Sequence, residues 1–263
     1  MEGAGYVKAI LNRVHSKILA GQKGVSERKL TMFLGFNLNK LVVMIVPLLF
    51  AVTIHEVAHG WVAYRLGDPT AKWSGRLTLN PIKHLDIMGS FILPLMLLLF
   101  RSPIIFGYAK PVPVNFSNLR NYRRDTILVA SAGVALNLIC ALVCGMVFQI
   151  MLRAGSFWSE SIFRFIALDL LYMLGYSVLI NAVLAVFNMI PVPPLDGSRI
   201  LSMLLPPQYA AQFAHLERFG MIILIFLLFT GALNGIISFF VEPILRISLG
   251  NEGLLILFRY ITH

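Results

Sequence analysis

The stretch that decides the fold is residues 33–66, which read FLGFNLNKLVVMIVPLLFAVTIHEVAHGWVAYRL. It is longer than the roughly 20 apolar residues that a membrane-spanning helix requires, and it ends at the turn-forming residues 67–69 (GDP). Ionisable side chains inside a spanning helix are costly and are normally retained for a function. The second half of this stretch nevertheless holds His55, Glu56 and His59. We therefore expect a spanning helix that carries chemistry.

The composition indicates that the rest of the chain also lies in a membrane. Hydrophobic residues make up 58% of the 263 residues, charged residues only 13%, and the mean hydropathy is +0.80. A soluble domain carries about 25% charged residues, so this chain has too few polar side chains to cover a soluble surface. An ordinary cytosolic enzyme, a disordered chain and a disulfide scaffold are excluded. We predict an all-α multi-pass membrane protein with about 4–6 transmembrane helices.

The charge and the cysteines fit the same class of protein. The net charge is +10, and basic residues of membrane proteins gather in loops that face anionic cytoplasmic lipid. We therefore expect contact with a lipid bilayer and no nucleic-acid partner. The two cysteines, Cys140 and Cys144, are one helical turn apart in an apolar run. We interpret them as packing residues, and they give no sign of an oxidising compartment.

Three regions follow one another along the chain. Residues 1–30 space apolar residues helically with basic residues between them, which is typical of an amphipathic helix on a membrane surface; a solvated tail fits equally well. Residues 31–245 would form the membrane domain. Residues 246–263 alternate apolar and polar residues and would form an interfacial C-terminal tail. Further spans are expected at 126–152, 165–190 and 219–241.

The connection after the first span has two unusual segments. Residues 87–100 are apolar but short and are broken by Pro94, which favours a re-entrant segment over a full span. Residues 76–79 alternate in polarity, which predicts one strand of a short β-hairpin. Such a strand could pair with an extended substrate by strand addition.

His55, Glu56 and His59 form an HExxH motif. Residues four apart on a helix share a face, so the two imidazoles can occupy two corners of a zinc tetrahedron. Glu56 points about 100° away from His55 around the helix axis. Its carboxylate therefore lies beside the metal, where it can take a proton from zinc-activated water.

A catalytic zinc site needs a third protein ligand that is distant in sequence and lies at the same depth. Asp196 is the best candidate, because residues 188–197 (NMIPVPPLDG) break the helix after the 165–190 span. Non-helical backbone at that depth is tolerated where it lines protein or a water-filled cavity. Taken alone, the segment could also be an interfacial turn with a helix N-cap.

Three further polar residues are weaker candidates. Asn188 and Asn137 could contact the substrate or stabilise the oxyanion of the tetrahedral intermediate, because a buried amide must find partners. Hydrogen bonds between helices are the alternative for both. His84 lies in a loop expected to return toward the membrane, and it could lie near the site or bond local backbone.

These residues resemble the site-2 protease family of intramembrane zinc metalloproteases over roughly residues 40–245. The pairing of HEVAH with NMIPVPPLDG carries the resemblance, and 75–86 (GRLTLNPIKHLD), 107–115 (GYAKPVPVN) and 131–137 (SAGVALN) are similar to the compact bacterial and archaeal branch. That branch lacks a PDZ or nucleotide-binding module. One position departs from the family pattern, because Val134 stands where the family usually has proline.

The resemblance implies a function and a ligand set. His55, His59 and Asp196 would hold one zinc ion, and Glu56 would be the general base. The enzyme would hydrolyse a peptide bond in or near the transmembrane segment of a membrane-protein substrate. Two alternatives stay open: an ion or metal transporter, in which His, Glu and Asp also mark cation sites, and a non-catalytic relative that retains the zinc site.

The metal site also constrains the topology. Zinc ligands lie within about 2 Å of the ion, so the span end that carries His59 and the span end before Asp196 must share a side. That condition requires residues 87–100 to be re-entrant, and we expect a site toward the cytoplasmic side of the inner membrane. The distribution of Lys and Arg alone favours the opposite arrangement of these two ends. We give the coordination geometry more weight.

Overall fold

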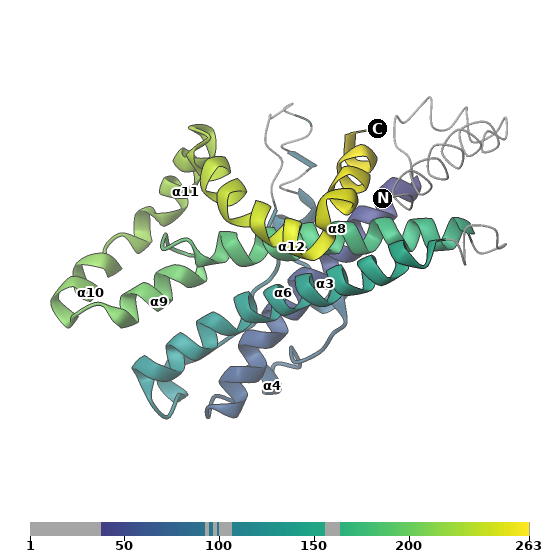
Figure 1. Cartoon of the computed structure of the whole chain (residues 1–263). Helices are drawn as coiled ribbons and strands as arrows, with labels where there is room; N and C mark the ends of the chain where they lie inside the picture. The colour runs from purple at the N-terminus through teal and green to yellow at the C-terminus, as the bar shows by residue number, and fades with distance from the viewer. Residues whose placement is uncertain (1–37, 93–94, 97–98, 100–106, 156–163, 263) are drawn as a thin grey trace.

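The computed structural model describes residues 38–92, 95–96, 99, 107–155 and 164–262. Three long helices form the centre of the described part, and each packs against the other two (Figure 1). These three helices are α3 (Leu38–Arg65), α6 (Tyr122–Arg153) and α8 (Arg164–Met189). The other helical elements are α4 (Thr70–Trp73), η1 (Pro81–His84), η2 (Ile87–Ile92), η3 (Phe116–Asn118), α9 (Asp196–Leu204), α10 (Pro207–Ala214), η4 (Glu217–Phe219), α11 (Gly220–Phe229) and α12 (Ala232–Thr262).

Five helical stretches of the described chain are long and apolar enough to cross a membrane. This number confirms the prediction of a multi-pass all-α membrane protein. Many of their large apolar side chains point outward, as expected where the surrounding medium is lipid. The five stretches are Asn39–Arg65, Tyr122–Arg153, Ile166–Met189, Pro207–Phe229 and Ala232–Ile261.

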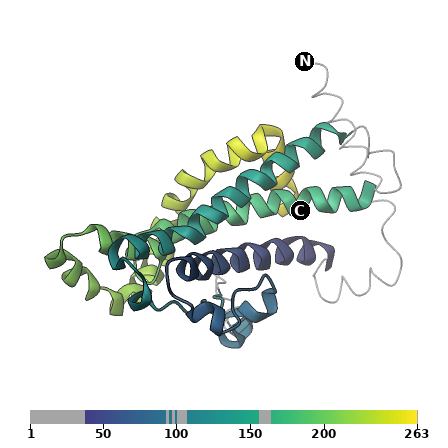
Figure 2. The same cartoon turned by 90° about the horizontal axis from the view of Figure 1, so that it is seen from below.

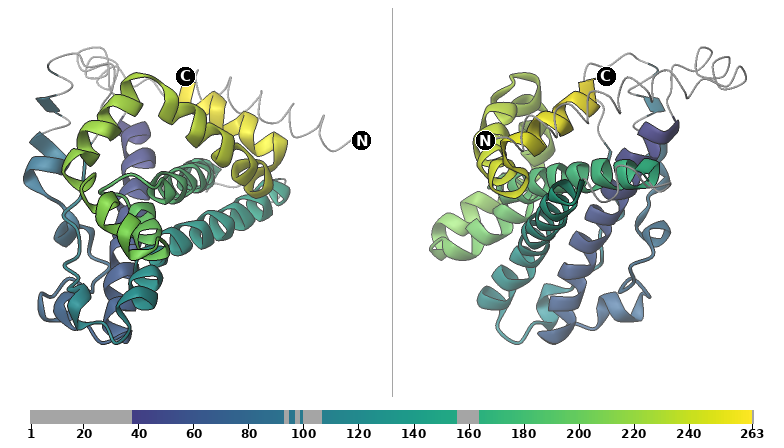
Figure 3. Two further views of the ribbon diagram at one scale, coloured as in Figure 1. Left: turned by 90° about the vertical axis from the view of Figure 1, so that its left-hand side faces the viewer. Right: turned by 45° about the vertical axis from the view of Figure 1, so that its right-hand side comes forward.

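The largest apolar cluster lies where α6, α8 and α12 meet. Phe148 of α6, Leu171 and Val178 of α8 and Leu249 of α12 are almost completely buried in it. Helix α12 packs on both α6 and α8, and α3 packs on the same pair (Figures 2 and 3). Dense packing of this kind resists small shifts, so α6, α8 and α12 are held in fixed positions relative to one another.

Local sequence explains where the helices begin and end. The Asn121 side chain accepts a hydrogen bond from the Arg124 amide at 3.3 Å and so caps the start of α6. Helix α8 ends at Met189, two residues before the first proline of the 188–197 segment. Gly231 adopts a left-handed conformation with φ 73° and separates α11 from α12. The single span predicted at 219–241 is therefore wrong, because two helices meet inside it.

The C-terminal residues are part of the helical core. Helix α12 continues to Thr262 with a kink at Gly250, where φ is 67° and ψ is 174°. Leu249 and Leu257 are buried in the main apolar cluster. The segment predicted as an interfacial tail at 246–263 is thus helical over the residues described and is continuous with the preceding helix.

The described residues contain no β-strand, so the hairpin predicted around 76–79 is not present among them. Local turns use the hydrogen-bonding groups of this segment instead. The Thr78 carbonyl lies 2.8 Å from Nε2 of His84, and the Asn80 side chain accepts from the Ile82 amide at 3.0 Å and begins the short helix η1. Alternating polarity indicated an extended segment, but the Asn-Pro turn directly after it leaves too few residues for a strand.

The two ends of the connection from α3 to α6 lie next to each other. The Arg120 amide donates to the Leu66 carbonyl at 3.2 Å. Between them, residues 87–92 form a π-helical turn. Residues 93–94, 97–98 and 100 of the predicted re-entrant stretch 87–100 lie outside the described residues, as does the N-terminal region 1–30.

Candidate functional site

Two imidazoles one helical turn apart on α3 form the centre of the candidate site. The Nε2 atoms of His55 and His59 lie 3.0 Å apart. The side chain of His55 is 9% exposed and that of His59 is 12% exposed. The helical spacing therefore places both nitrogens on one face, as the sequence predicts.

The third member of the site comes from the helix break after α8. Residues 191–194 turn the chain, with a cis peptide bond between Pro193 and Pro194, and α9 then begins at Asp196. The Oδ2 atom of Asp196 lies 3.2 Å from Nε2 of His55 and 3.2 Å from Nε2 of His59. The structure thus brings together the three residues that the sequence analysis selected as metal ligands.

The three side chains fit a zinc ion. Their ligand atoms lie within 4.8 Å of one another, and the shortest separations are 3.0, 3.2 and 3.2 Å. Zinc–ligand bonds of about 2.0 Å at tetrahedral angles give ligand–ligand edges of about 3.3 Å. Two imidazoles and one carboxylate on such a triangle leave the fourth corner of a tetrahedron open.

A backbone carbonyl on the far side of the ring fixes the orientation of the His59 imidazole. Its Nδ1 atom lies 2.7 Å from the carbonyl oxygen of Val129 on α6. A carbonyl only accepts, so Nδ1 carries the proton and donates, which leaves the lone pair of Nε2 directed at the site. Such a contact is typical of metal-binding histidines.

Helix α6 reaches this site through a glycine. A Cβ atom built on Gly133 would lie 2.6 Å from Cε1 of His55 and 2.6 Å from Nε2 of His59. Any side chain at position 133 would therefore occupy the space of the two imidazoles. The same closeness applies at Gly197, where a Cβ would lie 2.2 Å from the Met189 carbonyl oxygen.

Two features hold Asp196 and set its charge. Arg123 of α6 donates to the carbonyls of Met203 at 3.2 Å and Leu205 at 2.7 Å, and so ties the far end of α9 to α6. Burial acts to raise the pKa of the Asp196 carboxyl, which lies between two candidate spans, but the close approach of the two imidazoles outweighs burial and holds this pKa at about 2. Asp196 is therefore a carboxylate at neutral pH.

Glu56 lies beside the triangle and is half-buried. Its Oε2 atom accepts a hydrogen bond from the Val112 amide at 2.7 Å. The HExxH spacing predicts that Glu56 lies beside the candidate metal site, but it does not predict the Val112 contact, because a backbone donor carries no motif. Proline on both sides of Val112 was the available signal, since it leaves one isolated N–H in that stretch.

The three weaker candidates, Asn137, Asn188 and His84, differ in their hydrogen-bond partners. Asn137 is completely buried on α6, and neither amide atom has a hydrogen-bond partner among the described residues. Asn188 donates from Nδ2 to the Leu184 carbonyl of its own helix at 3.0 Å. His84 is buried and bonds the Thr78 carbonyl, and it is not one of the three residues that could hold a metal.

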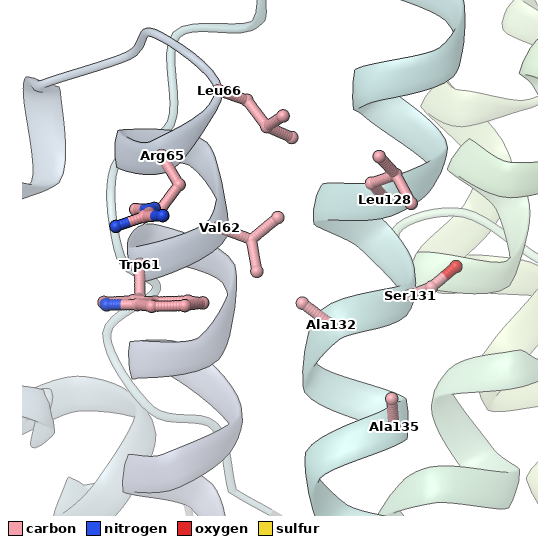
Figure 4. A pocket seen from close by; sticks show the side chains of 8 residues that line it. All are labelled: Trp61, Val62, Arg65, Leu66, Leu128, Ser131, Ala132 and Ala135. Carbon is pink, nitrogen blue, oxygen red and sulfur yellow. The ribbon is translucent and has the colours of Figure 1, made fainter.

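A separate apolar groove lies between α3 and α6, with a volume of about 350 Å³ (Figure 4). Val62 and Leu66 of α3 point toward it from one side, and Leu128 and Ala132 of α6 from the other. None of the three residues that could hold a metal lines this groove. We therefore place the candidate site at the histidine–aspartate triangle.

Comparisons with known proteins agree with this assignment. A family model described as Peptidase family M50 matches residues 43–230, which include the whole triangle. "Putative zinc metalloprotease YwhC" of Bacillus subtilis is 38% identical over 75% of this chain and 85% of its own length. "Putative zinc metalloprotease Rip2" is 30% identical in Mycolicibacterium smegmatis, over 73% of this chain and 69% of its own, and 28% in Mycobacterium tuberculosis, over 74% and 69%. No solved structure matches the chain.

Proposed function

The chain belongs to peptidase family M50, the site-2 protease family of zinc metalloproteases, and from this premise we propose that it cleaves membrane proteins within the membrane. The bond hydrolysed lies in or near the transmembrane segment of the substrate. One observation carries the proposal: the triangle joins His55 and His59, which lie in the second half of the candidate span Asn39–Arg65, to Asp196, which follows the candidate span Ile166–Met189. A site there meets a peptide bond at the edge of the bilayer.

Each residue of the triangle has one task in this proposal. His55, His59 and Asp196 hold a single zinc ion through Nε2, Nε2 and Oδ2. Bound zinc supplies a Lewis acid that activates a water molecule and polarises the scissile carbonyl. The Val129 carbonyl keeps His59 in the tautomer that can bind metal. Gly133 leaves the room that these groups need.

Glu56 is the general base in the proposed mechanism. It is next to His55 on α3 and is not part of the ligand triangle. Its carboxylate takes a proton from the attacking water and passes it to the leaving amine, so that the new carboxyl and amino ends are both formed. Its half-buried position lets it reach both a water molecule and the substrate.

Asn137 and Asn188 are proposed to contact the substrate. The unpartnered buried amide of Asn137 supports this role, because leaving such a group unsatisfied is costly unless a ligand completes its hydrogen bonds. Asn188 donates one Nδ2 hydrogen to the Leu184 carbonyl within α8, and its amide nitrogen has a second N–H as a further donor. A donor of this kind stabilises the oxyanion that forms on the scissile carbonyl.

The topology is also proposed from the site. The hydrogen bond from Arg120 to Leu66 brings the ends of the α3–α6 connection together, so the chain between them makes no net crossing. We infer that residues 87–100 are re-entrant and that the site faces the cytoplasmic side of the inner membrane. The metalloprotease domain would comprise residues 31–245, and the N-terminal region before it would lie at the membrane surface, while the residues after it continue helix α12.

The proposal is tested with a defined substrate in vesicles. The probe is a synthetic peptide with one leucine-rich transmembrane segment interrupted by Gly and Pro, since these residues let the helix unwind and expose its peptide bonds. The peptide carries a fluorophore and a quencher at its ends. Wild type should cleave it, Glu56→Gln should lose cleavage while retaining zinc, and the matched control Glu217→Gln should behave as wild type. Equal cleavage by Glu56→Gln and wild type would contradict the proposed mechanism.

A further inference from the structure

An extended segment, residues 110–115, passes directly over Glu56, and we name it the strap. Three backbone amides attach it to its surroundings. The first, at Lys110, donates to the His84 carbonyl at 2.9 Å. The second, at Val112, donates to Glu56, and the third, at Asn115, donates to Asp68 at 2.7 Å. The strap is therefore fixed at both ends and touches Glu56 in its middle.

Arg76 fixes the same segment through its carbonyl groups. Its Nη2 atom donates to the carbonyl of Lys110 at 2.7 Å and to that of Pro111 at 3.4 Å. Arg76 is only 9% exposed, and no ion pair joins it to a carboxylate in the described part of the chain. Burying a guanidinium without a carboxylate is expensive, so the two carbonyl contacts are what hold it there.

One peptide unit connects Arg76 to Glu56. The carbonyl of Pro111 and the amide of Val112 belong to the same planar group, and they point in opposite directions. Arg76 binds the carbonyl side and Glu56 binds the amide side. A cation on the carbonyl side also polarises the unit and strengthens the N–H as a donor. Displacing Arg76 would therefore change where the Glu56 carboxylate lies.

We propose that Arg76 is a positioning residue for Glu56, acting through the peptide unit between Pro111 and Val112. The inference rests on the proposed role of Glu56 as general base. The Val112 amide occupies Oε2 of Glu56, so Oε1 is the oxygen that receives the proton from water. Without Arg76 the strap shifts, Oε1 loses its alignment, and turnover falls while substrate binding and the metal ligands are unaffected.

The first readout separates positioning from a merely structural role. Arg76→Ala, Arg76→Lys and the control Lys83→Ala are assayed with the same vesicle peptide, together with zinc per chain. Lys83 is a suitable control because it is an exposed cation in the same loop and contacts the Gly75 carbonyl rather than the strap. Arg76→Ala should lower kcat about 10- to 100-fold, the size expected when a catalytic group moves by about 1 Å. KM and zinc should stay unchanged, Arg76→Lys should restore most of kcat, and Lys83→Ala should match wild type.

The second readout needs no catalysis. Hydrogen exchange of the Val112 amide is followed by NMR of ¹⁵N-valine-labelled protein, with Val112→Pro identifying the signal. Removing the acceptor in Glu56→Ala should speed exchange at least about tenfold, since the donor then opens to water. Arg76→Ala should speed it as well, and Lys83→Ala should not.

The outcomes separate this inference from the proposed function. Unchanged kcat in Arg76→Ala, or a loss confined to KM or zinc content, would overturn the positioning role. Unchanged exchange of the Val112 amide in Arg76→Ala would overturn it as well. A wild type that leaves the peptide intact would contradict the proposed function, and the exchange measurement would still decide whether Arg76 controls the strap over Glu56.

Discussion

The Nε2 atom of His59 and the Oδ2 atom of Asp196 lie 3.2 Å apart, although one belongs to α3 and the other follows the break after α8. Two separate sets of hydrogen bonds hold this pair in position. The Val129 carbonyl orients the imidazole from α6, and Arg123 of the same helix ties down α9, which begins at Asp196. Helix α6 thus holds the candidate metal ligands of the other two elements together.

The glycine of α6 that faces the imidazoles gives the first prediction. Gly133→Ala should lower the affinity for zinc about 10- to 100-fold, the range found when groups around metal ligands are disturbed, because its new Cβ overlaps both histidines. Zinc per chain is measured after dialysis against a chelator. Gly145→Ala is the control. Gly145 lies on the same helix as Gly133, and a Cβ built on it would lie 2.6 Å from Ser248 of α12, as close as the Cβ at Gly133 lies to the two histidines. This substitution should lower thermal stability and leave zinc in place.

Arg123 provides a prediction about the contact between α6 and α9. Arg123→Ala removes the donors that satisfy the carbonyls of Met203 and Leu205. Hydrogen bonds from a charged group contribute about 1.5–3 kcal/mol, so unfolding should become easier by an amount of this order and zinc should dissociate faster. Thermal unfolding and the rate of zinc release to a chelator measure the two effects. The neighbour Arg124→Ala is the control, and an equal effect of the two substitutions would contradict a specific role for Arg123.

The unpartnered amide of Asn137 gives a prediction in which stability and activity separate. Asn137→Leu replaces a buried, unsatisfied amide with an apolar side chain of similar size, which should leave stability unchanged or raise it. If the amide contacts the substrate, kcat should fall about 100-fold, as for the loss of an oxyanion donor. Asn181→Leu is the matched control, because Asn181 is also buried but donates to the Ser177 carbonyl at 2.8 Å. It should lower stability instead, and full activity in Asn137→Leu would contradict the proposed contact.

Asp68 gives a prediction about pH. Burial acts to raise the pKa of its carboxyl, but hydrogen bonds from Thr70, Asn118 and Asn115 outweigh burial. The pKa of Asp68 in the folded protein is therefore lowered. Stability from this carboxylate is therefore present above its unfolded pKa of about 3.9 and is lost as pH falls through the folded value. Thermal unfolding between pH 7 and pH 3 should show this loss in wild type.

Asp68→Asn is the variant that tests the assignment. It should be less stable than wild type at pH 7, by about 1–3 kcal/mol for disturbed buried hydrogen bonds, and its stability should depend less on pH below 4 than that of wild type. Glu217→Gln, on an exposed residue, is the control and should keep the wild-type profile. An identical acid profile for Asp68→Asn and wild type would show that another group is responsible.

Sequence alone selects the three residues that the structure brings together, for physical reasons. The spacing of His55 and His59 fixes their common face because helical geometry has few degrees of freedom. The cost of a carboxylate near the bilayer pointed to Asp196, since an ionisable residue there needs a partner. The predicted partners are the ones that lie within contact distance in the structure.

Other parts of the fold were beyond this kind of inference. Backbone groups have no sequence signature, so the Val112 amide on Glu56 and the carbonyls on Arg76 were not foreseen. The alternation at 76–79 resembled a strand, and the following turn overrode it. Gly231 was a visible break signal in the 219–241 run, but the surrounding apolar residues masked it.

The measurement that tests the central claim most directly is bound zinc per chain in purified protein, for wild type, His55→Ala, Asp196→Ala and the control Asp86→Ala. Our account predicts about one zinc per chain in wild type and in Asp86→Ala, because the described residues contain one triangle of candidate ligands. It predicts loss of zinc in both of the other variants. Undiminished zinc in Asp196→Ala, or a wild type that binds none, would contradict the account.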